Sequence, residues 1–270
     1  MYNNDELKKI ATQVRRDIIE QVYQARSGHP GGALSCTDIL TVLYFNVMNI
    51  KTDNPNWEDR DRLVLSKGHA CPALYSVLAR RGFYDVDSIK SFRKTGSIFQ
   101  GHPALGKVPG VDMTNGSLGQ GFSISNGMAL AGKLDNKDYY TFVIVGDGEL
   151  QEGQNWEAAM TAAHYKLNRL ILFVDNNNLQ IDGKITDVKS PKPIPDKFKA
   201  FGFNVIEIDG HNFDEIQEAI NKVKESQDKP TAIIAHTIKG KGISFMEDDA
   251  GWHGRYPSEE EYEKAMSELI

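Results

Sequence analysis

The chain has 270 residues, of which 40% are hydrophobic and 25% are charged. This composition is typical of a soluble globular protein, and the length allows one large α/β domain or two small ones. The formal net charge is −6, and charges of both signs are interspersed. The absence of a basic stripe or an acidic tail argues against nucleic-acid binding and against disorder.

Three further features predict a cytoplasmic protein without a membrane partner. The N-terminus, MYNNDELKKIATQVRRD, is too polar for a signal peptide. No apolar run approaches the roughly 20 residues of a membrane span. Cys36 and Cys71 lack the spacing of a metal site or a disulfide framework, so we expect free, buried thiols in a reducing compartment.

Apolar spacing in the first half of the chain predicts helices over residues 5–26, 36–48, 72–81, 86–94 and 119–133. We expect Asn4 or Asp5 to cap the first helix, and Pro72 to lie in the first turn of the third. A short apolar strand is predicted at residues 62–65. Residues 95–117 are rich in Gly and Pro and form a long loop, which in a compact domain is usually functional.

The second half alternates strands and helices. Strands are predicted at residues 139–145, 169–175, 203–208 and 231–236. Helices are predicted between the first two strands, shortly after Pro195, and over residues 212–225 and 258–269. This order favours an α/β fold, a parallel sheet with helices on both faces. Because no linker is visible, we expect residues 1–270 to form a single domain.

Polar turns follow two neighbouring buried strands. Gly146-Asp147-Gly148 ends the strand at 139–145, and the turn Asn176-Asn177-Asn178 ends the strand at 169–175. A strand, helix, strand unit of this length makes the two strands parallel, so both turns lie at carboxyl ends, where open α/β sheets bind ligands. Asp147 and Asn177 offer oxygen donors of the kind that Mg²⁺ or Ca²⁺ accepts, with phosphate and water completing the shell.

Four histidines lie in Gly-rich loops, namely His29, His69, His102 and His253. These loops fall outside the buried strands, so the imidazoles can converge at one edge of the sheet. Such a group suits a sugar phosphate, because imidazoles donate to hydroxyl and phosphate oxygens and move protons near neutral pH. The residue type alone also allows four unrelated surface histidines.

A Gly-Asp-Gly turn followed thirty residues later by an Asn-rich turn resembles the thiamine diphosphate (ThDP) motif. The segments GDGELQEGQNWEA and NNNLQIDG resemble transketolase in particular. The segments SGHPGG, SKGHA, GHP, GSLGQG and a late HG follow in the order of that family. The resemblance covers residues 7–256, which is only the first part of a full-length transketolase.

The resemblance implies a ThDP-binding fold and a set of cofactor contacts. Asp147, Asn177 and the backbone carbonyl of Leu179 would be the Mg²⁺ ligands, with Ca²⁺ or Mn²⁺ as alternatives. The diphosphate would lie against Gly148 and His69, and His253 would also reach it. Further cofactor contacts would come from Gly116, Ser117 and Leu118, the last near the ring system, and Glu152 would link the two cofactor sites across a dimer.

The resemblance also implies a substrate channel lined by His29, His102 and His253, which would hold a ketose phosphate. The expected reaction transfers a two-carbon ketol unit to an aldose phosphate. His164, His211 and His236 match no histidine of the family; we expect His164 on a helix surface and His236 at a strand end.

The pyrimidine-binding domain of the family, which supplies the catalytic glutamate, is missing here. We therefore expect an N-terminal subunit that is silent alone and works with a separate C-terminal subunit, two copies of each. Alternatives are a split transketolase for a branched or sulfonated ketose, a deoxyxylulose-phosphate synthase, a 2-oxo acid dehydrogenase α subunit, or a non-enzymatic ThDP-binding module. A nucleotide-binding Rossmann domain lacks its fingerprint here.

Overall fold

A five-stranded parallel sheet forms the centre of the protein. The computed structural model describes residues 1–225 and 228–270. The sheet has the order β1-β2-β3-β7-β6. Its strands are β1 (Arg62–Leu65), β2 (Thr141–Gly146), β3 (Leu170–Asn176), β7 (Thr231–His236) and β6 (Asn204–Asp209). All four pairings are parallel, so every strand delivers its following loop to the same edge.

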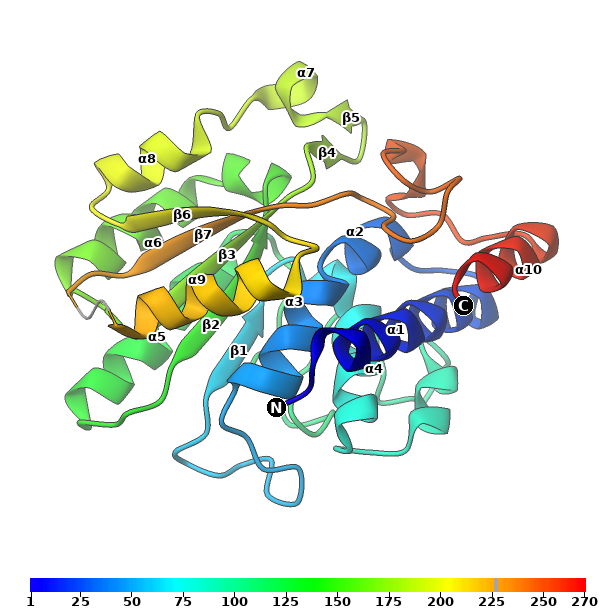
Figure 1. The fold of residues 1–270 in the computed structure, drawn as a ribbon, viewed down its shortest axis with the longest axis horizontal. Helices are drawn as coiled ribbons and strands as arrows, with labels where there is room; N and C mark the ends of the chain where they lie inside the picture. Colours follow the sequence, from blue (N-terminus) through cyan, green and yellow to red (C-terminus); the bar gives the residue numbers. More distant parts are fainter. Residues whose placement is uncertain (226–227) are drawn as a thin grey trace.

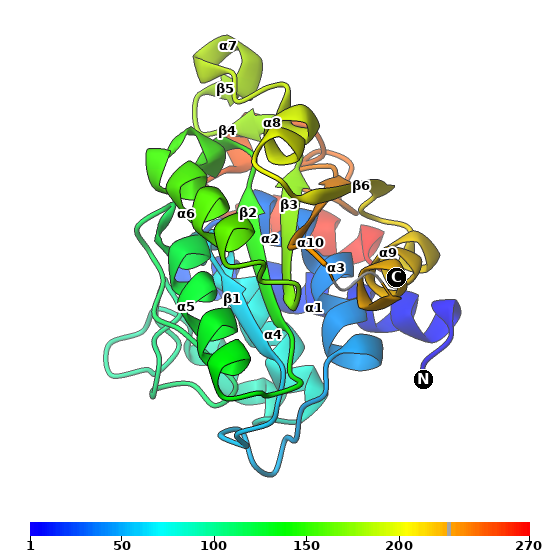
Figure 2. The same cartoon turned by 90° about the vertical axis from the view of Figure 1, so that its left-hand side faces the viewer.

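Helices cover both faces of this sheet, as Figures 1 and 2 show. One face carries α1 (Asn4–Ala25), α2 (Pro30–Ser35), α3 (Thr37–Val42), α4 (Cys71–Arg81), α9 (Phe213–Glu225) and α10 (Glu259–Glu268). The other carries α5 (Gln120–Leu134), α6 (Gly153–His164) and α8 (Ile194–Ala200). The predicted fold class is confirmed.

The side chains of the central strands alternate between the two cores. Phe142 and Phe173 pack into the core beneath α1, α3 and α4. Val143 and Leu172, their neighbours in sequence, pack into the core beneath α5 and α6. Successive residues of a strand point to opposite faces, so the sequence of a strand that is covered on both faces is a continuous apolar run.

Short elements fill the connections. They are η1 (Leu43–Val47), η2 (Gly68–Ala70), η3 (Val86–Ser91), η4 (Gly148–Gln151), η5 (Ala250–Trp252), α7 (Ile185–Lys189), and the antiparallel pair β4 (Leu179–Gln180) and β5 (Gly183–Lys184). Within the described ranges, residues 92–119 contain neither helix nor strand, so the predicted long loop is confirmed. No described helix has both the length and the apolar character needed to cross a bilayer.

Several predicted boundaries are wrong for local reasons. Asn3, rather than Asn4 or Asp5, caps α1, because its side chain and that of Glu6 form a reciprocal capping box. The helix predicted over 36–48 is divided into α3 and the π-helical turn η1, and α2 begins at Pro30 inside a predicted loop. The helix predicted over 86–94 is the 3-10 segment η3.

Candidate functional site

The loops that leave the carboxyl ends of β1, β2, β3 and β7 surround a cavity of about 360 Å³. Ten of the predicted site residues line it: His29, His69, Gly116, Leu118, Asp147, Gly148, Glu152, Asn177, Leu179 and His253. His102 and Ser117, two further predicted site residues, are not among its lining residues, although a Cβ at Gly116 would lie 3.5 Å from the His102 ring. The parallel order of the strands thus gathers residues from the whole length of the chain.

The carboxylate of Asp147 is buried, with 1% exposure, directly after β2. Its oxygens accept hydrogen bonds from the backbone N–H groups of Gly148 at 2.7 Å and Asn178 at 2.5 Å. No cationic side chain in the described part of the chain forms an ion pair with it. Burial, and next the nearby carboxylate of Asp175, raise the pKa of Asp147 to about 7. A buried carboxylate without a cationic partner is the chemistry of a divalent-cation ligand.

Asn177 reaches the same edge because of strand register. Strands β2 and β3 pair Gly146 with Asp175, so the turns that follow these residues are neighbours. The Nδ2 of Asn177 donates toward Oδ2 of Asp175 at 3.3 Å, while Oδ1 accepts from the N–H of Leu179 at 3.1 Å. The amide oxygen therefore points away from Asp175. Together with Asp147 it offers a divalent cation two oxygens from adjacent strand ends.

A buried ion pair that the sequence analysis missed supports this turn. Lys67, after β1, pairs with Asp175, and both side chains are almost fully buried. Asp175 also accepts hydrogen bonds from the hydroxyls of Ser35, at 2.6 Å, and Thr237. Lys67 donates to the carbonyl of Gly32 at 2.6 Å. Although burial opposes it, the Lys67 ammonium holds the pKa of Asp175 below its usual range, so the pair is charged at neutral pH.

A second missed lysine, Lys239, lines the cavity from the loop after β7. It is 2% exposed, and its Nζ lies 3.0 Å from Nδ1 of His253. Within residues 1–225 and 228–270, no carboxylate forms an ion pair with it. Burial, and next the Lys67 ammonium, lower the pKa of Lys239 to about 8. It is therefore mostly a buried cation at pH 7, without an anionic partner.

Three of the four loop histidines that were predicted to converge do so. The ring centroids are 5.2 Å apart for His29 and His69, 5.4 Å for His29 and His253, and 5.0 Å for His69 and His253. Burial is the main cause that lowers their pKa values, to about 4 for His29, to about 3 for His253, and well below the usual value for His69. The three imidazoles are neutral at pH 7, so each carries one N–H donor and one acceptor nitrogen.

Close backbone contacts hold the loops around the cavity together. A Cβ at Gly68 would lie 2.8 Å from the carbonyl oxygen of Asn115, so the loop before Gly116 packs directly on the turn after β1. The buried carboxylate of Glu149 accepts from the N–H groups of Gly119 at 2.8 Å and Gly146 at 3.0 Å. These contacts fix the loop and the strand end together.

Glu152 lines the cavity at its exposed side and precedes α6. The β4–β5 hairpin, which the sequence analysis did not predict, adds Gln180 and Ile181 to the wall. Ile181 is 67% exposed although it is apolar. The cavity therefore has a polar interior and an open, partly apolar rim.

The cavity holds two unlike charges. Neither the carboxylate of Asp147 nor the ammonium of Lys239 forms an ion pair with a described residue. A ligand that carries a divalent cation next to a phosphate group complements both at once. Neutral imidazole donors complete the lining.

Comparison with known proteins identifies the family. Residues 7–269 match the sequence profile of the transketolase, thiamine diphosphate binding domain. A 6-deoxy-6-sulfo-D-fructose transketolase subunit of Clostridium sp. is 44% identical over 98% of this chain and 96% of its own length. An apulose-4-phosphate transketolase subunit of Phocaeicola vulgatus is 43% identical over 94% of this chain and 90% of its own length. The chain belongs to the transketolase family.

Solved transketolase structures have the same fold as this chain. The transketolase of Campylobacter jejuni superposes with a TM-score of 0.93 and 36% identity over 99% of this chain. That of Leishmania mexicana superposes with a TM-score of 0.91 and 33% identity. This chain spans only 43% and 41% of those two longer chains. The predicted family and the predicted likeness to its N-terminal, ThDP-binding part are both confirmed.

Proposed function

We propose that this chain is the N-terminal subunit of a split transketolase, which binds ThDP with a divalent cation and acts with a separate C-terminal subunit. The observation that carries the proposal is the pair of unmatched charges in one cavity, Asp147 and Lys239. The nearly full-length match to two relatives that are named as transketolase subunits supports the need for a partner. Two copies of each subunit form the assembly, in the cytoplasm.

The carboxylate of Asp147, the amide oxygen of Asn177 and the carbonyl of Leu179 hold Mg²⁺, and Ca²⁺ or Mn²⁺ can replace it. Lys239, Gly148, His69 and His253, which line the same cavity, would hold the diphosphate beside this ion. Gly116, Ser117 and Leu118 would contact the rest of the cofactor, and Glu152 would connect the two sites of the assembly. When bound, ThDP supplies the electron sink for ketol transfer.

The histidines of this chain hold the sugar. With their pKa values lowered, His29 and His253 stay neutral and donate hydrogen bonds to the hydroxyl and carbonyl oxygens of a ketose. His102 adds a donor beside Gly116. Because these rings are largely buried, they limit the access of water to the reacting carbons.

A second candidate substrate class is an unusual ketose. One relative is named for a sulfonated fructose and another for apulose 4-phosphate, and both are more similar in sequence than the Aquifex aeolicus transketolase, which is 40% identical. The reaction type is the same for each donor. The choice among them rests on residues at the rim and on the partner subunit.

The test is reconstitution with a candidate C-terminal subunit, in the presence of ThDP and Mg²⁺. Transfer from xylulose 5-phosphate, fructose 6-phosphate, 6-deoxy-6-sulfo-D-fructose and apulose 4-phosphate to ribose 5-phosphate or glyceraldehyde 3-phosphate would be measured for each chain alone and for the mixture. Activity only in the mixture supports the proposal. Turnover by this chain alone, or a stable complex that binds no ThDP, would contradict it.

A further inference from the structure

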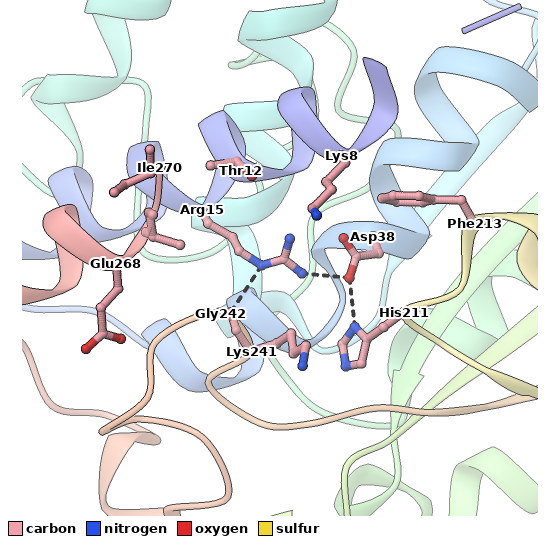
Figure 3. A pocket seen from close by; sticks show the side chains of 11 residues that line it. Lys8, Thr12, Arg15, Asp38, His211, Phe213, Lys241, Gly242, Glu268 and Ile270 are labelled. Carbon is pink, nitrogen blue, oxygen red and sulfur yellow. Dashed lines mark hydrogen bonds and ion pairs between the residues drawn. The ribbon is translucent and has the colours of Figure 1, made fainter. Parts of the chain in front are cut away.

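A cluster of buried polar side chains lies behind the loop that carries Lys239, outside the cofactor cavity. Figure 3 shows this cluster at a separate pocket of about 320 Å³, lined by residues from α1, α3, the start of α9 and the chain's last residues. Its centre is Asp38 of α3, which is 4% exposed. Arg15 of α1 and His211 point toward it from two sides.

Asp38 is the shared acceptor of the cluster. Its Oδ2 accepts from Nη2 of Arg15 at 2.6 Å and from Nδ1 of His211 at 2.7 Å. Burial raises the pKa of Asp38, but the Arg15 guanidinium and the His211 hydrogen bond outweigh burial and hold it below its usual range. The carboxylate is thus charged at neutral pH and fixes both partners.

Both partners of Asp38 also form hydrogen bonds with the backbone of the loop after β7. Nε2 of His211 accepts from the backbone N–H of Ile238 at 2.9 Å, so the ring proton is on Nδ1, facing Asp38. Nε of Arg15 donates to the backbone carbonyl of Lys241 at 3.1 Å. The two bonds hold the residues on either side of Lys239 and Gly240.

The same loop is held from the cofactor side. The N–H of Gly240 donates to the carbonyl of Gly31 at 3.0 Å, and the N–H of Asp248 donates to the carbonyl of Lys239 at 3.0 Å. A Cβ at Gly31 would lie 3.1 Å from Cε of Lys239, so the lysine stem packs against the backbone of α2. With both sides fixed, the ammonium has little freedom to leave the cavity.

We propose that Asp38 is a positioning residue of the cofactor site, because through His211 and Arg15 it fixes residues 238 and 241 and so aims Lys239 at the bound diphosphate. The role of Lys239 in this inference rests on the proposed function, in which its ammonium contacts the diphosphate. Asp38 itself touches neither cofactor nor substrate. Its effect on binding is transmitted by backbone alone.

The test uses Asp38→Asn, which keeps the size of the side chain. In one orientation the new amide turns its NH₂ group toward the two donors, and in the other it offers them an oxygen without the negative charge. Two readouts are needed. The first is hydrogen–deuterium exchange of the peptide covering residues 237–242 in the chain itself. The second is the Kd of the reconstituted assembly for ThDP at saturating Mg²⁺. We expect faster exchange in residues 237–242 and a Kd that is roughly 10-fold higher, as for other residues that orient a ligand-contacting group.

A matched control separates positioning from general destabilisation. Asp17 of α1 forms a bidentate ion pair with Arg80 at 2.6 and 2.7 Å, but neither residue contacts the loop after β7 in the described structure. Asp17→Asn should lower thermal stability without changing loop exchange or Kd. Lys8→Ala, in the same pocket as Asp38, should change neither. His211→Gln retains a donor and an acceptor and should recover part of the loss seen in His211→Ala.

Unchanged exchange in Asp38→Asn would overturn the proposal, and so would faster exchange with a wild-type Kd. Equal loss of affinity in Asp17→Asn would also overturn it, because the effect would then be general. If the wild-type assembly binds no ThDP, the proposed function fails. The exchange measurement would still decide whether Asp38 fixes the loop.

Discussion

Nζ of Lys239 lies 3.0 Å from Nδ1 of His253, in the cavity that Asp147 also lines. An ammonium only donates, so Nδ1 of His253 accepts and its proton is on Nε2. The lysine therefore fixes the tautomer of the histidine and remains available to an anion. This relationship makes the charge of Lys239 the feature most directly open to experiment.

Replacing Lys239 by Met should weaken ThDP binding by about 10- to 100-fold, since a hydrogen bond to a charged group contributes about 1.5–3 kcal/mol. Removing a buried cation that lacks an anionic partner should leave the stability of the ligand-free chain unchanged or higher. Calorimetric Kd values and melting temperatures would be measured together. Lys241→Met is the control, because that ammonium pairs with Glu247 at 3.3 Å. A destabilised Lys239→Met chain would contradict this account.

Diphosphate binding should take up protons above pH 8. The pKa of Lys239 is lowered to about 8 without ligand, and a bound anion raises it. Between about pH 8 and 10 the free site is largely neutral and the occupied site is charged, so the affinity falls as pH rises. Titration calorimetry in buffers of different ionisation enthalpy would count the protons. Lys239→Met should abolish most of this uptake.

Asp147→Asn should abolish the Mg²⁺ dependence of ThDP binding and leave the fold intact. The pKa of Asp147 is raised to about 7, above its value in an unfolded chain of about 3.9. Such a carboxyl destabilises the folded state increasingly as pH rises from about 4 to 7, and the penalty is complete above pH 7. The ligand-free variant should therefore melt at a higher temperature than wild type at pH 8 and equally at pH 4. Normal cofactor binding by the variant would refute the metal assignment.

Lys67→Met should lower the free energy of unfolding by about 3–5 kcal/mol, because it leaves the buried carboxylate of Asp175 without its cation. The Lys67→Met/Asp175→Leu double variant should lose less than the sum of the two single variants. Denaturant unfolding of all four proteins gives the coupling energy. Because the pKa of Asp175 is below its usual range, the wild-type contribution should persist above pH 4 and disappear as pH falls below it. Additive losses would show that the two residues act independently.

Local patterns predicted much of the site. The apolar runs before Asp147 and Asn177 indicated parallel buried strands, and the register of β2 and β3 does place the following turns side by side. The Gly-rich loops around His29, His69, His102 and His253 were expected to converge. The rings of His29, His69 and His253 lie within 5.4 Å of one another, whereas His102 does not line the cavity with them. The free, buried state of both cysteines was also predicted correctly.

The importance of Lys67 and Lys239 was missed, although Lys67 lies in the segment SKGHA, which was compared with the family. A lysine on a loop is usually solvated, and no local pattern reveals that these two are 2% exposed. The one available signal was their position just after buried strands. The β4–β5 hairpin was also missed, because two-residue strands carry no periodicity.

The sequence by itself determined the class of fold, the family and the residues that offer oxygen and imidazole ligands, since strand patterns, glycine turns and motif order are properties of short segments. Only the tertiary structure decided which charges are paired. Lys67 and Asp175 meet across 108 positions, and Asp38 reaches the loop of Lys239 through His211, 173 positions away. Whether a charge is compensated depends on burial and on distance in space, and neither quantity is contained in a local pattern.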